Sequence, residues 1–359
     1  MTLADLGWTD DFAAAFGPHA AVGRQPARVT LPLKGFWEVT TPETARLGEA
    51  TGKFLHVTAG PTDMPAVGDW VAMEPKPGDS TRALIHAVLP RRTKFSRQAA
   101  GEQVVEQVVA ANVDTVFLIS SLDGNFNLRR IERYLAAARA SGAQPVVVLN
   151  KSDLTKQAAD LRAEAEVIAG GVPVVVTSAI RRGGLQALAP WLRPRRTVAF
   201  LGSSGVGKST LINEIVGTDV QFTQEIRAID GKGRHTTTER ELLVSPDGVL
   251  IIDTPGMREL QPWQAEEAVD NVFADVIALA GRCKFRDCTH GPEPGCAVQA
   301  ALADGSLERP RWQSYLRLAR ENALAQRQTD RLLAQQTKSE RKKATKQLRQ
   351  RIDEKHGED

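Results

Sequence analysis

Residues Gly202–Thr210 have the sequence GSSGVGKST, which matches the phosphate-binding pattern G-x-x-x-x-G-K-[ST]. An apolar run, TVAFL, precedes the pattern, and a segment with helical spacing, STLINEIVG, follows it. The glycines of such a loop let backbone N–H groups curl around phosphates, and the helix N-terminus adds a favourable dipole. We expect Lys208 to reach the β- and γ-phosphates and Ser209 to bind Mg²⁺. The predicted nucleotide-binding loop is therefore Gly202, Ser203, Ser204, Gly205, Val206, Gly207, Lys208, Ser209 and Thr210.

A second pattern, NKSD, lies upstream of this loop at the end of the apolar run PVVVL. As a guanine reader, the Asp153 carboxylate would accept bonds from guanine N1–H and the 2-amino group, which adenine cannot supply. Asn150 would tie loops together, and the Lys151 stem would pack over the base. The backbone of TSA, after the next strand, can donate to guanine O6. These residues favour a GTPase over an ATPase. The predicted guanine-binding residues are Asn150, Lys151, Ser152, Asp153, Thr177, Ser178 and Ala179.

The pattern DTPG, at Asp253–Gly256, follows the buried run VLIID. We expect Asp253 to hold Mg²⁺ directly or through water, and the Gly256 N–H to sense the γ-phosphate. The segment GKGRHTTTER lies where a switch segment is expected, and one of its threonines should bind Mg²⁺ with GTP. Thr237 or Thr238 is favoured over Thr236, and the alternative is a threonine-rich strand edge.

The residue after DTPG is Met257, where many GTPases have a glutamine that orients the attacking water. Methionine cannot do this, so we expect slow intrinsic turnover that needs a partner or another residue. His235 in the switch segment is the catalytic candidate beside Lys208, and the alternative is an ordinary exposed histidine.

The order of these patterns differs from the usual order in GTPases and indicates a circular permutation of the domain. Apolar runs alternate with helical segments from residue 113 to about 256, which indicates a mainly parallel sheet with helices on both faces. The guanine-binding patterns precede the phosphate loop, whereas GTPases usually begin at that loop. Joining the usual ends and cutting after DTPG gives the same sheet, so the sequence predicts a circularly permuted P-loop GTPase. The segment after DTPG, which is usually the second switch of a GTPase, then leads directly into the C-terminal part of the chain. Loss of the γ-phosphate could therefore move that C-terminal part.

Both flanks indicate further domains. Residues 24–92 contain short β-rich runs separated by Gly and Pro turns, which predicts a small closed barrel. An OB-fold is the first interpretation and an SH3-type barrel the alternative. We therefore predict a multidomain α/β protein with a lead-in and barrel at 1–95, a GTPase domain at 96–261, and a helical zinc-binding domain with a basic extension at 262–359.

The three cysteines of the chain all lie in the stretch CKFRDCTHGPEPGC. Cys283, Cys288, His290 and Cys296 have the spacing C-x4-C-x-H-x5-C, which can close a tetrahedral structural zinc shell with no open position. The alternative is free thiols near a chance histidine. An odd number of grouped cysteines argues against a disulfide framework.

Composition and charge place few further limits on the function. The 359 residues carry a net charge of +3, with no apolar run long enough to span a membrane and no basic secretory leader. We expect a cytoplasmic monomer without a membrane partner. Basic clusters at residues 91–97 and 338–351 favour RNA contact, and the alternative for each is a solvated face.

Taken together, these motifs resemble a known family. The permuted order, GDWV, LPRRTKFSR, GSSGVGKST, GRHTTT, DTPGM and the Cys3His spacing are similar to the ribosome small-subunit-dependent GTPase A family (RsgA type), over nearly the whole chain. The resemblance implies an OB domain, a permuted GTPase domain and a zinc domain. It also implies binding to small ribosomal subunits and their rRNA late in maturation, with GTP hydrolysis stimulated by the subunit. The competing hypothesis is a GTP-dependent switch on another RNA or protein, in which hydrolysis is incidental.

Overall fold

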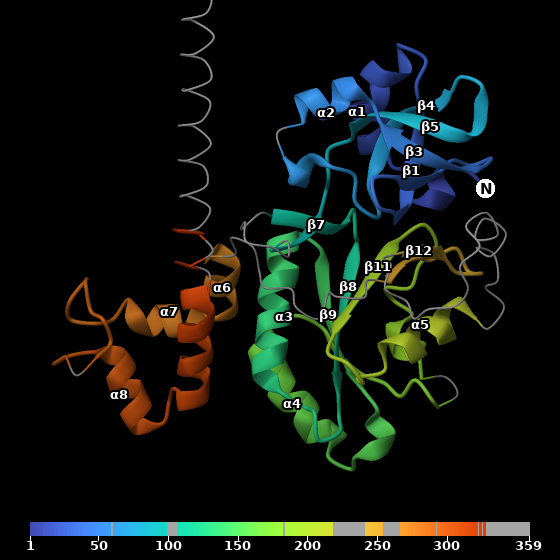
Figure 1. The fold of residues 1–359 in the computed structure, drawn as a ribbon. Coiled ribbons are helices and arrows are strands. Elements are labelled where there is room, and N and C mark those ends of the chain that lie inside the picture. The colour runs from blue at the N-terminus through green and yellow to red at the C-terminus, as the bar shows by residue number, and fades with distance from the viewer. Residues whose placement is uncertain are drawn as a thin grey trace, which may run out of the picture.

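A computed structural model gives the fold, and its described residues are 1–58, 60–98, 106–181, 184–217, 241–253, 266–291, 293–321, 323–324 and 326–327. Three parts are visible in Figure 1: a barrel, a central sheet flanked by helices, and a group of C-terminal helices beside α3. None of the described helices combines the length and the apolar character that crossing a membrane requires.

The N-terminal part is a closed barrel of five strands in the order β1-β2-β3-β5-β4. The strand β3 pairs in parallel with β5, whereas the other neighbours are antiparallel, and α2 lies between β3 and β4. This Greek-key order confirms the OB-fold and excludes the SH3-type alternative. The elements are β1 (Gln25–Pro32), β2 (Trp37–Thr40), β3 (Ala45–Ala50), α2 (Gly52–Val57), η2 (Pro61–Asp63), β4 (Trp70–Lys76) and β5 (Asp79–Val88).

Alternating side chains of the barrel strands fill its interior, where Val29, Val39, Val71, Met73 and Ile85 are fully buried. The N-terminal lead-in, η1 (Ala4–Leu6) and α1 (Asp10–Ala20), packs a separate apolar cluster that includes Trp70 against the outside of the barrel. The lead-in therefore belongs to the barrel.

A buried arginine helps to join the barrel to the central sheet. Arg28 of β1 is 1% exposed and donates to the carbonyl oxygens of Leu6, Gly68 and Asn112 and to the hydroxyl of Thr197. Burial lowers the pKa of Arg28 to about 10, and nearby Asp114 offsets part of that effect. Because Thr197 begins β11, the barrel is attached where the central strands begin.

A two-stranded antiparallel hairpin, β6 (Lys94–Gln98) and β7 (Glu106–Ala111), leads from the barrel to the sheet. The predicted boundary between residues 95 and 96 falls inside β6 and stays a prediction.

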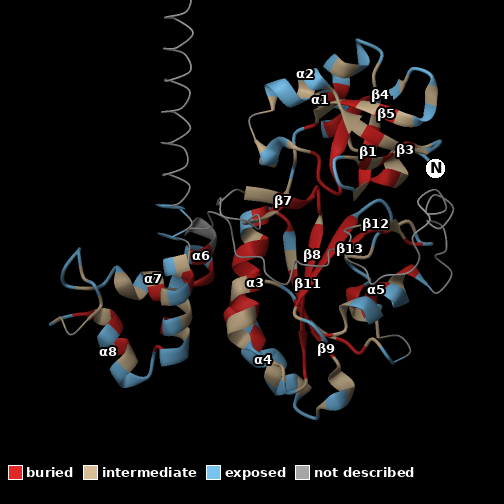
Figure 2. Cartoon of the chain, viewed as in Figure 1, coloured by how far each residue is buried: buried red, intermediate tan, exposed pale blue. Residues whose placement is uncertain are grey.

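The central sheet has the strand order β10-β9-β8-β11-β13-β12. All neighbours are parallel except the edge strand β12, which is antiparallel to β13. The sheet is therefore mainly parallel, as predicted, and its central strands are buried (Figure 2). The strands are β8 (Thr115–Ser121), β9 (Gln144–Asn150), β10 (Val174–Val176), β11 (Thr197–Gly202), β12 (Glu241–Val244) and β13 (Leu250–Asp253).

Helices cover both faces of this sheet. One face packs against α3 (Leu128–Ser141) and α4 (Ala158–Ala169) through residues that include Ile131 and Leu135, and the other against α5 (Lys208–Val216) through Leu211 and Ile212. Short turns, η3 (Ser152–Leu154) and η4 (Gln186–Leu188), follow β9 and β10.

The C-terminal helices dock on α3. They are α6 (Glu266–Val272), α7 (Ala274–Ala280), α8 (Ala297–Asp304) and a helical segment at 309–321. A fully buried carboxylate, Glu132 of α3, accepts bonds from Arg311 at 2.6 Å, Arg129 at 2.7 Å and Ser314 at 2.8 Å. Arg311 also bonds both oxygens of Asp275. We call this group, Glu132 with Arg129, Asp275, Arg311 and Ser314, the Glu132 clamp.

Candidate functional site

The predicted phosphate loop joins β11 to α5 at the carboxyl end of the sheet. Gly202 ends β11, and Gly207 precedes the first helical residue with φ +94°, in the left-handed region. The Nζ of Lys208 donates to the carbonyl oxygens of Gly202 at 2.6 Å and Ser203 at 2.7 Å, so the loop curls around its ammonium group. Val206 is buried in the core, whereas Ser204, Gly205, Ser209 and Thr210 are exposed. The loop thus has a buried side-chain anchor in Val206 and an exposed surface that can meet a ligand.

Asn150 connects the phosphate loop to the guanine-binding segments. Its side chain is 1% exposed, its Nδ2 donates to the Val206 carbonyl at 2.9 Å, and its Oδ1 accepts from the Ala179 N–H at 3.1 Å. A Cβ on Gly207 would meet Asn150 Nδ2 at 2.3 Å, so only glycine permits this approach. The structure therefore brings together the three segments that the sequence places far apart.

The other residues of the guanine-binding segments lie around this bridge. Ser178 donates to the Asp153 carboxylate, and this bond is the main reason that the pKa of Asp153 is lowered. The Ser152 N–H donates to the Thr177 carbonyl at 3.1 Å. Asp153 thus stays ionised at neutral pH, which is the state that accepts two N–H groups of guanine.

Lys151 contacts a residue that sequence analysis did not single out. Its Nζ lies 2.9 Å from an oxygen of Asp123, in the loop between β8 and α3, and this bond is the main cause that lowers the pKa of Asp123 to about 2. Ser121 and the Asn125 N–H also donate to Asp123, which therefore shapes the loop. Arg130, at the start of α3, was also missed, and it bonds Ser203. The only available signal was that this loop follows a strand at the edge that carries the other motifs.

Asp253 ends β13 beside the phosphate loop. Burial raises the pKa of its carboxyl, and the nearby Lys208 ammonium opposes that effect. A half-buried carboxylate next to a phosphate loop has the donor type that Mg²⁺ prefers. The remaining predicted residues, His235, Thr236, Thr237, Thr238, Gly256 and Met257, lie outside the described residues.

The cysteine and histidine residues form a compact cluster at the start of α8. The Cys283 sulfur lies 3.5 Å from His290 Nδ1 and 3.9 Å from the Cys296 sulfur, which is 3.7 Å from the same nitrogen. With Cys288, all four ligand atoms lie within 4.8 Å of one another. Zinc bonds of about 2.0–2.3 Å in a tetrahedron place neighbouring ligands about 3.5–3.8 Å apart, so the cluster fits zinc. Trp312 packs edge-on against His290 and fixes the ring.

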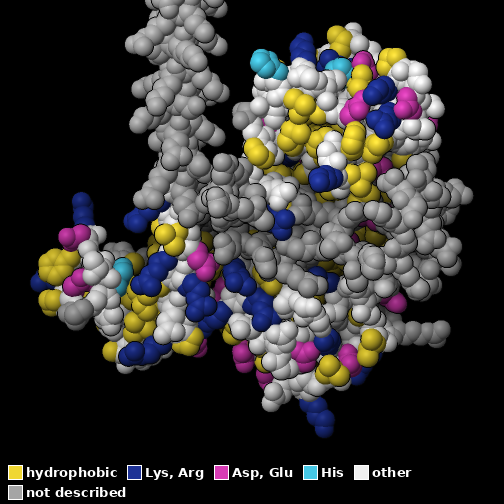
Figure 3. Space-filling view, in the orientation of Figure 1, with side chains coloured by type: hydrophobic (Ala, Val, Ile, Leu, Met, Phe, Trp, Pro, Cys, Tyr) yellow, Lys and Arg dark blue, Asp and Glu magenta, His cyan; other side chains and the backbone are white. Residues whose placement is uncertain are grey.

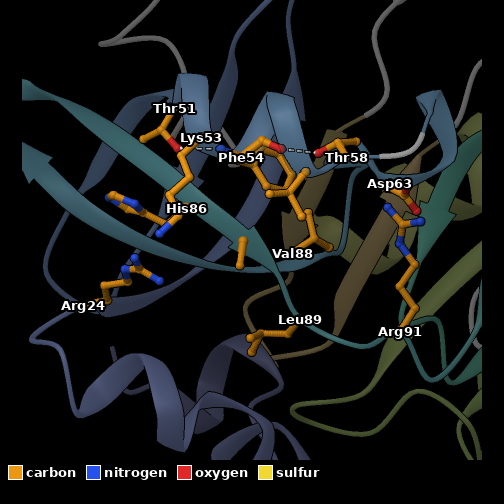
Figure 4. A pocket seen from close by; sticks show the side chains of 12 residues that line it. Arg24, Thr51, Lys53, Phe54, Thr58, Asp63, His86, Val88, Leu89 and Arg91 are labelled. Atoms are coloured by element: carbon orange, nitrogen blue, oxygen red, sulfur yellow. Dashed lines mark hydrogen bonds between the residues drawn. The ribbon is translucent and has the colours of Figure 1, made fainter. Parts of the chain in front are cut away.

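The basic cluster at 91–97 is largely neutralised within the chain. Arg91 forms a pair with the fully buried Asp69 at 2.7 Å, and Arg92 and Lys94 pair with Asp114 and Glu106. These contacts favour a structural role over the phosphate contact proposed from the sequence. Arg91 also borders a pocket of about 550 Å³ on the barrel, shown in Figure 4 with Lys53, Phe54 and His86, which lies away from the predicted nucleotide residues.

The fold and the bridged loops together define a circularly permuted P-loop GTPase. The RsgA GTPase family matches the chain over residues 88–263. The small ribosomal subunit biogenesis GTPase RsgA of Opitutus terrae is 54% identical over 351 residues, which cover 96% of each chain. The chain therefore belongs to the RsgA family of GTPases.

Other relatives agree with this assignment. An RsgA of Methanosarcina acetivorans is 42% identical over 88% of this chain and 84% of its own. The crystal structure of YjeQ from Thermotoga maritima is 26% identical, with a TM-score of 0.57 over 84% of this chain and 99% of that one. YloQ, described as a circularly permuted GTPase, is 25% identical, with a TM-score of 0.55 over 84% of this chain and 95% of that one.

Proposed function

We propose that this protein hydrolyses GTP as a maturation factor of the small ribosomal subunit, and that the subunit stimulates hydrolysis. The observation that best supports GTP hydrolysis is the pair of hydrogen bonds made by Asn150, which joins the phosphate loop and the guanine-binding segments at one edge of the sheet. The names of relatives up to 54% identical, which are small ribosomal subunit biogenesis GTPases, support the ribosomal partner.

Each part of the site has a proposed role in this reaction. Asp153 selects guanine, Lys208 and the loop N–H groups hold the phosphates, and Ser209, Asp253 and Thr237 or Thr238 hold Mg²⁺. Mg²⁺ neutralises charge on the phosphate oxygens. Gly256 senses the γ-phosphate and His235 assists the attacking water, since Met257 cannot orient it.

The zinc ion has a structural role. Cys283, Cys288, His290 and Cys296 complete a four-ligand shell without a position for substrate, so zinc stabilises the C-terminal helices.

Small-subunit rRNA is the proposed contact of a monomeric, cytoplasmic protein. Figure 3 shows Lys and Arg side chains gathered on α3 and on the facing C-terminal helix, which supports contact with a phosphate backbone there. The cluster at 91–97 is paired internally, and so are Arg129 of α3 and Arg311 of the facing helix, so the proposed contact rests on the other Lys and Arg side chains of this surface.

The test is GTP turnover by the purified protein, alone and with small subunits, large subunits or bulk RNA. Stimulation by small subunits alone supports the proposal. Equal turnover in every sample would leave a GTPase without this partner, and a GTP-dependent switch on another RNA or protein would then be favoured.

A further inference from the structure

Arg130 approaches the phosphate loop from outside the motifs that define the nucleotide site. It lies in the first turn of α3, which Asn127 caps by accepting the Arg130 N–H at 3.1 Å. Its Nη1 donates to the Ser203 hydroxyl at 2.7 Å and to Asn125 Oδ1 at 3.0 Å. The Ser203 carbonyl binds Lys208 Nζ, so two cations contact the same loop residue.

The charge of Arg130 has no matching anion in the described part of the chain. Both of its acceptors are neutral, and no described carboxylate forms an ion pair with it. Its neighbour Arg129 is instead paired with Glu132 and Glu308. A guanidinium binds ionised oxygens more strongly than neutral ones, so a phosphate beside Ser203 would be a better partner than either present acceptor.

The guanidinium is also held in place by the guanine-binding side of the site. Lys151 binds Asp123, Asp123 accepts the Asn125 N–H at 2.9 Å, and Asn125 accepts from Arg130. A continuous series of hydrogen bonds therefore runs from the NKSD motif to the phosphate loop. This series positions the guanidinium beside the phosphate loop, where it can exchange its two neutral acceptors for an ionised phosphate oxygen.

We propose that Arg130 is a second cation of the phosphate site, one that moves from Ser203 and Asn125 to a terminal phosphate oxygen of bound GTP. The role rests on the proposed GTP hydrolysis. Water attacks the γ-phosphorus, the bond to the β–γ bridging oxygen breaks, and the electron pair of that bond stays on the GDP oxygen. A proton of the water passes to an oxygen of the released phosphate. Arg130 remains protonated and stabilises the negative charge on these oxygens, as an arginine supplied within the same chain does in other GTPases.

The experiment compares Arg130→Ala, Arg130→Lys and Arg133→Ala in the full chain. Arg133 lies one turn further along α3, is half-buried, and has no described contact with the phosphate loop, so it controls for charge and helix stability. Three quantities are measured: single-turnover GTP hydrolysis, the affinities for GDP and GTP, and binding of GDP with aluminium fluoride.

We expect Arg130→Ala to lower the hydrolysis rate at least about tenfold. Catalytic arginines of other GTPases raise the hydrolysis rate about 10³- to 10⁵-fold. It should also lose aluminium fluoride binding while its GDP affinity stays within about twofold of wild type. Arg130→Lys keeps the charge without the planar fork and should fall between Arg130→Ala and wild type. Arg133→Ala should match wild type.

Two results would overturn the role. Hydrolysis by Arg130→Ala at the Arg133→Ala rate would show that the guanidinium does not act on the reaction. Equal losses of GDP and GTP affinity would show that Arg130 only braces the loop. A wild-type protein that neither binds nor hydrolyses GTP would instead contradict the proposed function itself, and with it this role.

Discussion

The Glu132 clamp gives a prediction of measurable size for the attachment of the C-terminal helices. Glu132 is fully buried, and the side chain of Arg311 is 15% exposed. Removing one partner of a buried pair costs about 3–5 kcal/mol, whereas an exposed pair contributes about 0–1 kcal/mol. Because Glu132 would keep Arg129 and Ser314, we expect a coupling energy of about 2 kcal/mol between Arg311 and Glu132.

A double-mutant cycle measures this coupling. Arg311→Met keeps much of the stem, Glu132→Gln keeps the shape, and the double variant completes the cycle. Amide hydrogen exchange then gives the opening free energy of residues 266–321, with α4 as an internal control. A coupling of 2 kcal/mol corresponds to about a 30-fold change in exchange rate at the same amides.

The result that refutes this reasoning is a coupling below about 0.5 kcal/mol, the range of an exposed pair. Loss of protection in α4 to the same extent as in residues 266–321 would also contradict it, because the variants would then destabilise the whole protein.

Three further predictions concern the loops and the metal cluster. Gly207→Ala should weaken GDP and GTP binding at least about tenfold, because the added Cβ meets Asn150. Gly205 has a similar φ of +80° but open space around it, so Gly205→Ala should weaken nucleotide binding less. Equal losses of affinity in the two variants would show that the contact with Asn150 has no such role. Cys296→Ser should lower the zinc content, measured by elemental analysis, from one ion per chain to none, and it should reduce hydrogen-exchange protection in α8. The control Thr289→Ala should change neither quantity. A Cys296→Ser protein that still carries zinc would refute the ligand assignment. Asp123→Asn should destabilise the protein by about 1 kcal/mol above pH 5, since solvent screens this partly exposed pair. The pKa of Asp123 in the folded protein, about 2, lies below the ordinary value of 3.8, so this stability is lost as the pH falls below about 4 towards 2. A difference in urea unfolding free energy between wild type and Asp123→Asn that stays constant down to pH 3 would contradict the assignment.

The sequence predicted those parts of the site that depend on local motifs. The phosphate loop, NKSD and TSA each follow a parallel strand, and carboxyl ends of parallel strands meet at one edge, so their meeting through Asn150 could be expected. The barrel could be predicted from turn spacing alone. The antiparallel direction of β12 could not, because it depends on chain routing rather than on the residues Glu241–Val244.

Long-range polar contacts were not predictable. Glu132 lies in a helical run with an apolar face, and only packing shows that Arg311, far along the chain, covers it. Similarly, Arg91 and Lys94 form a basic cluster in the sequence, but their carboxylate partners Asp69 and Glu106 become visible only in the fold. Charge clusters in a sequence therefore say little about exposed charge until their partners are known.

The two attachments to the GTPase domain differ in how they can respond to nucleotide. Arg28 joins the barrel to Thr197 and Asn112, where the central strands begin, whereas the phosphate loop follows the opposite end of β11. The C-terminal helices instead bind Glu132, in the same turns of α3 that carry Arg130. A guanidinium that moves between Ser203 and a phosphate would thus act on the helix to which those helices are attached. We therefore expect the state of the nucleotide to change the C-terminal docking while the barrel keeps its position, because the contacts of Arg28 lie at the far end of the sheet.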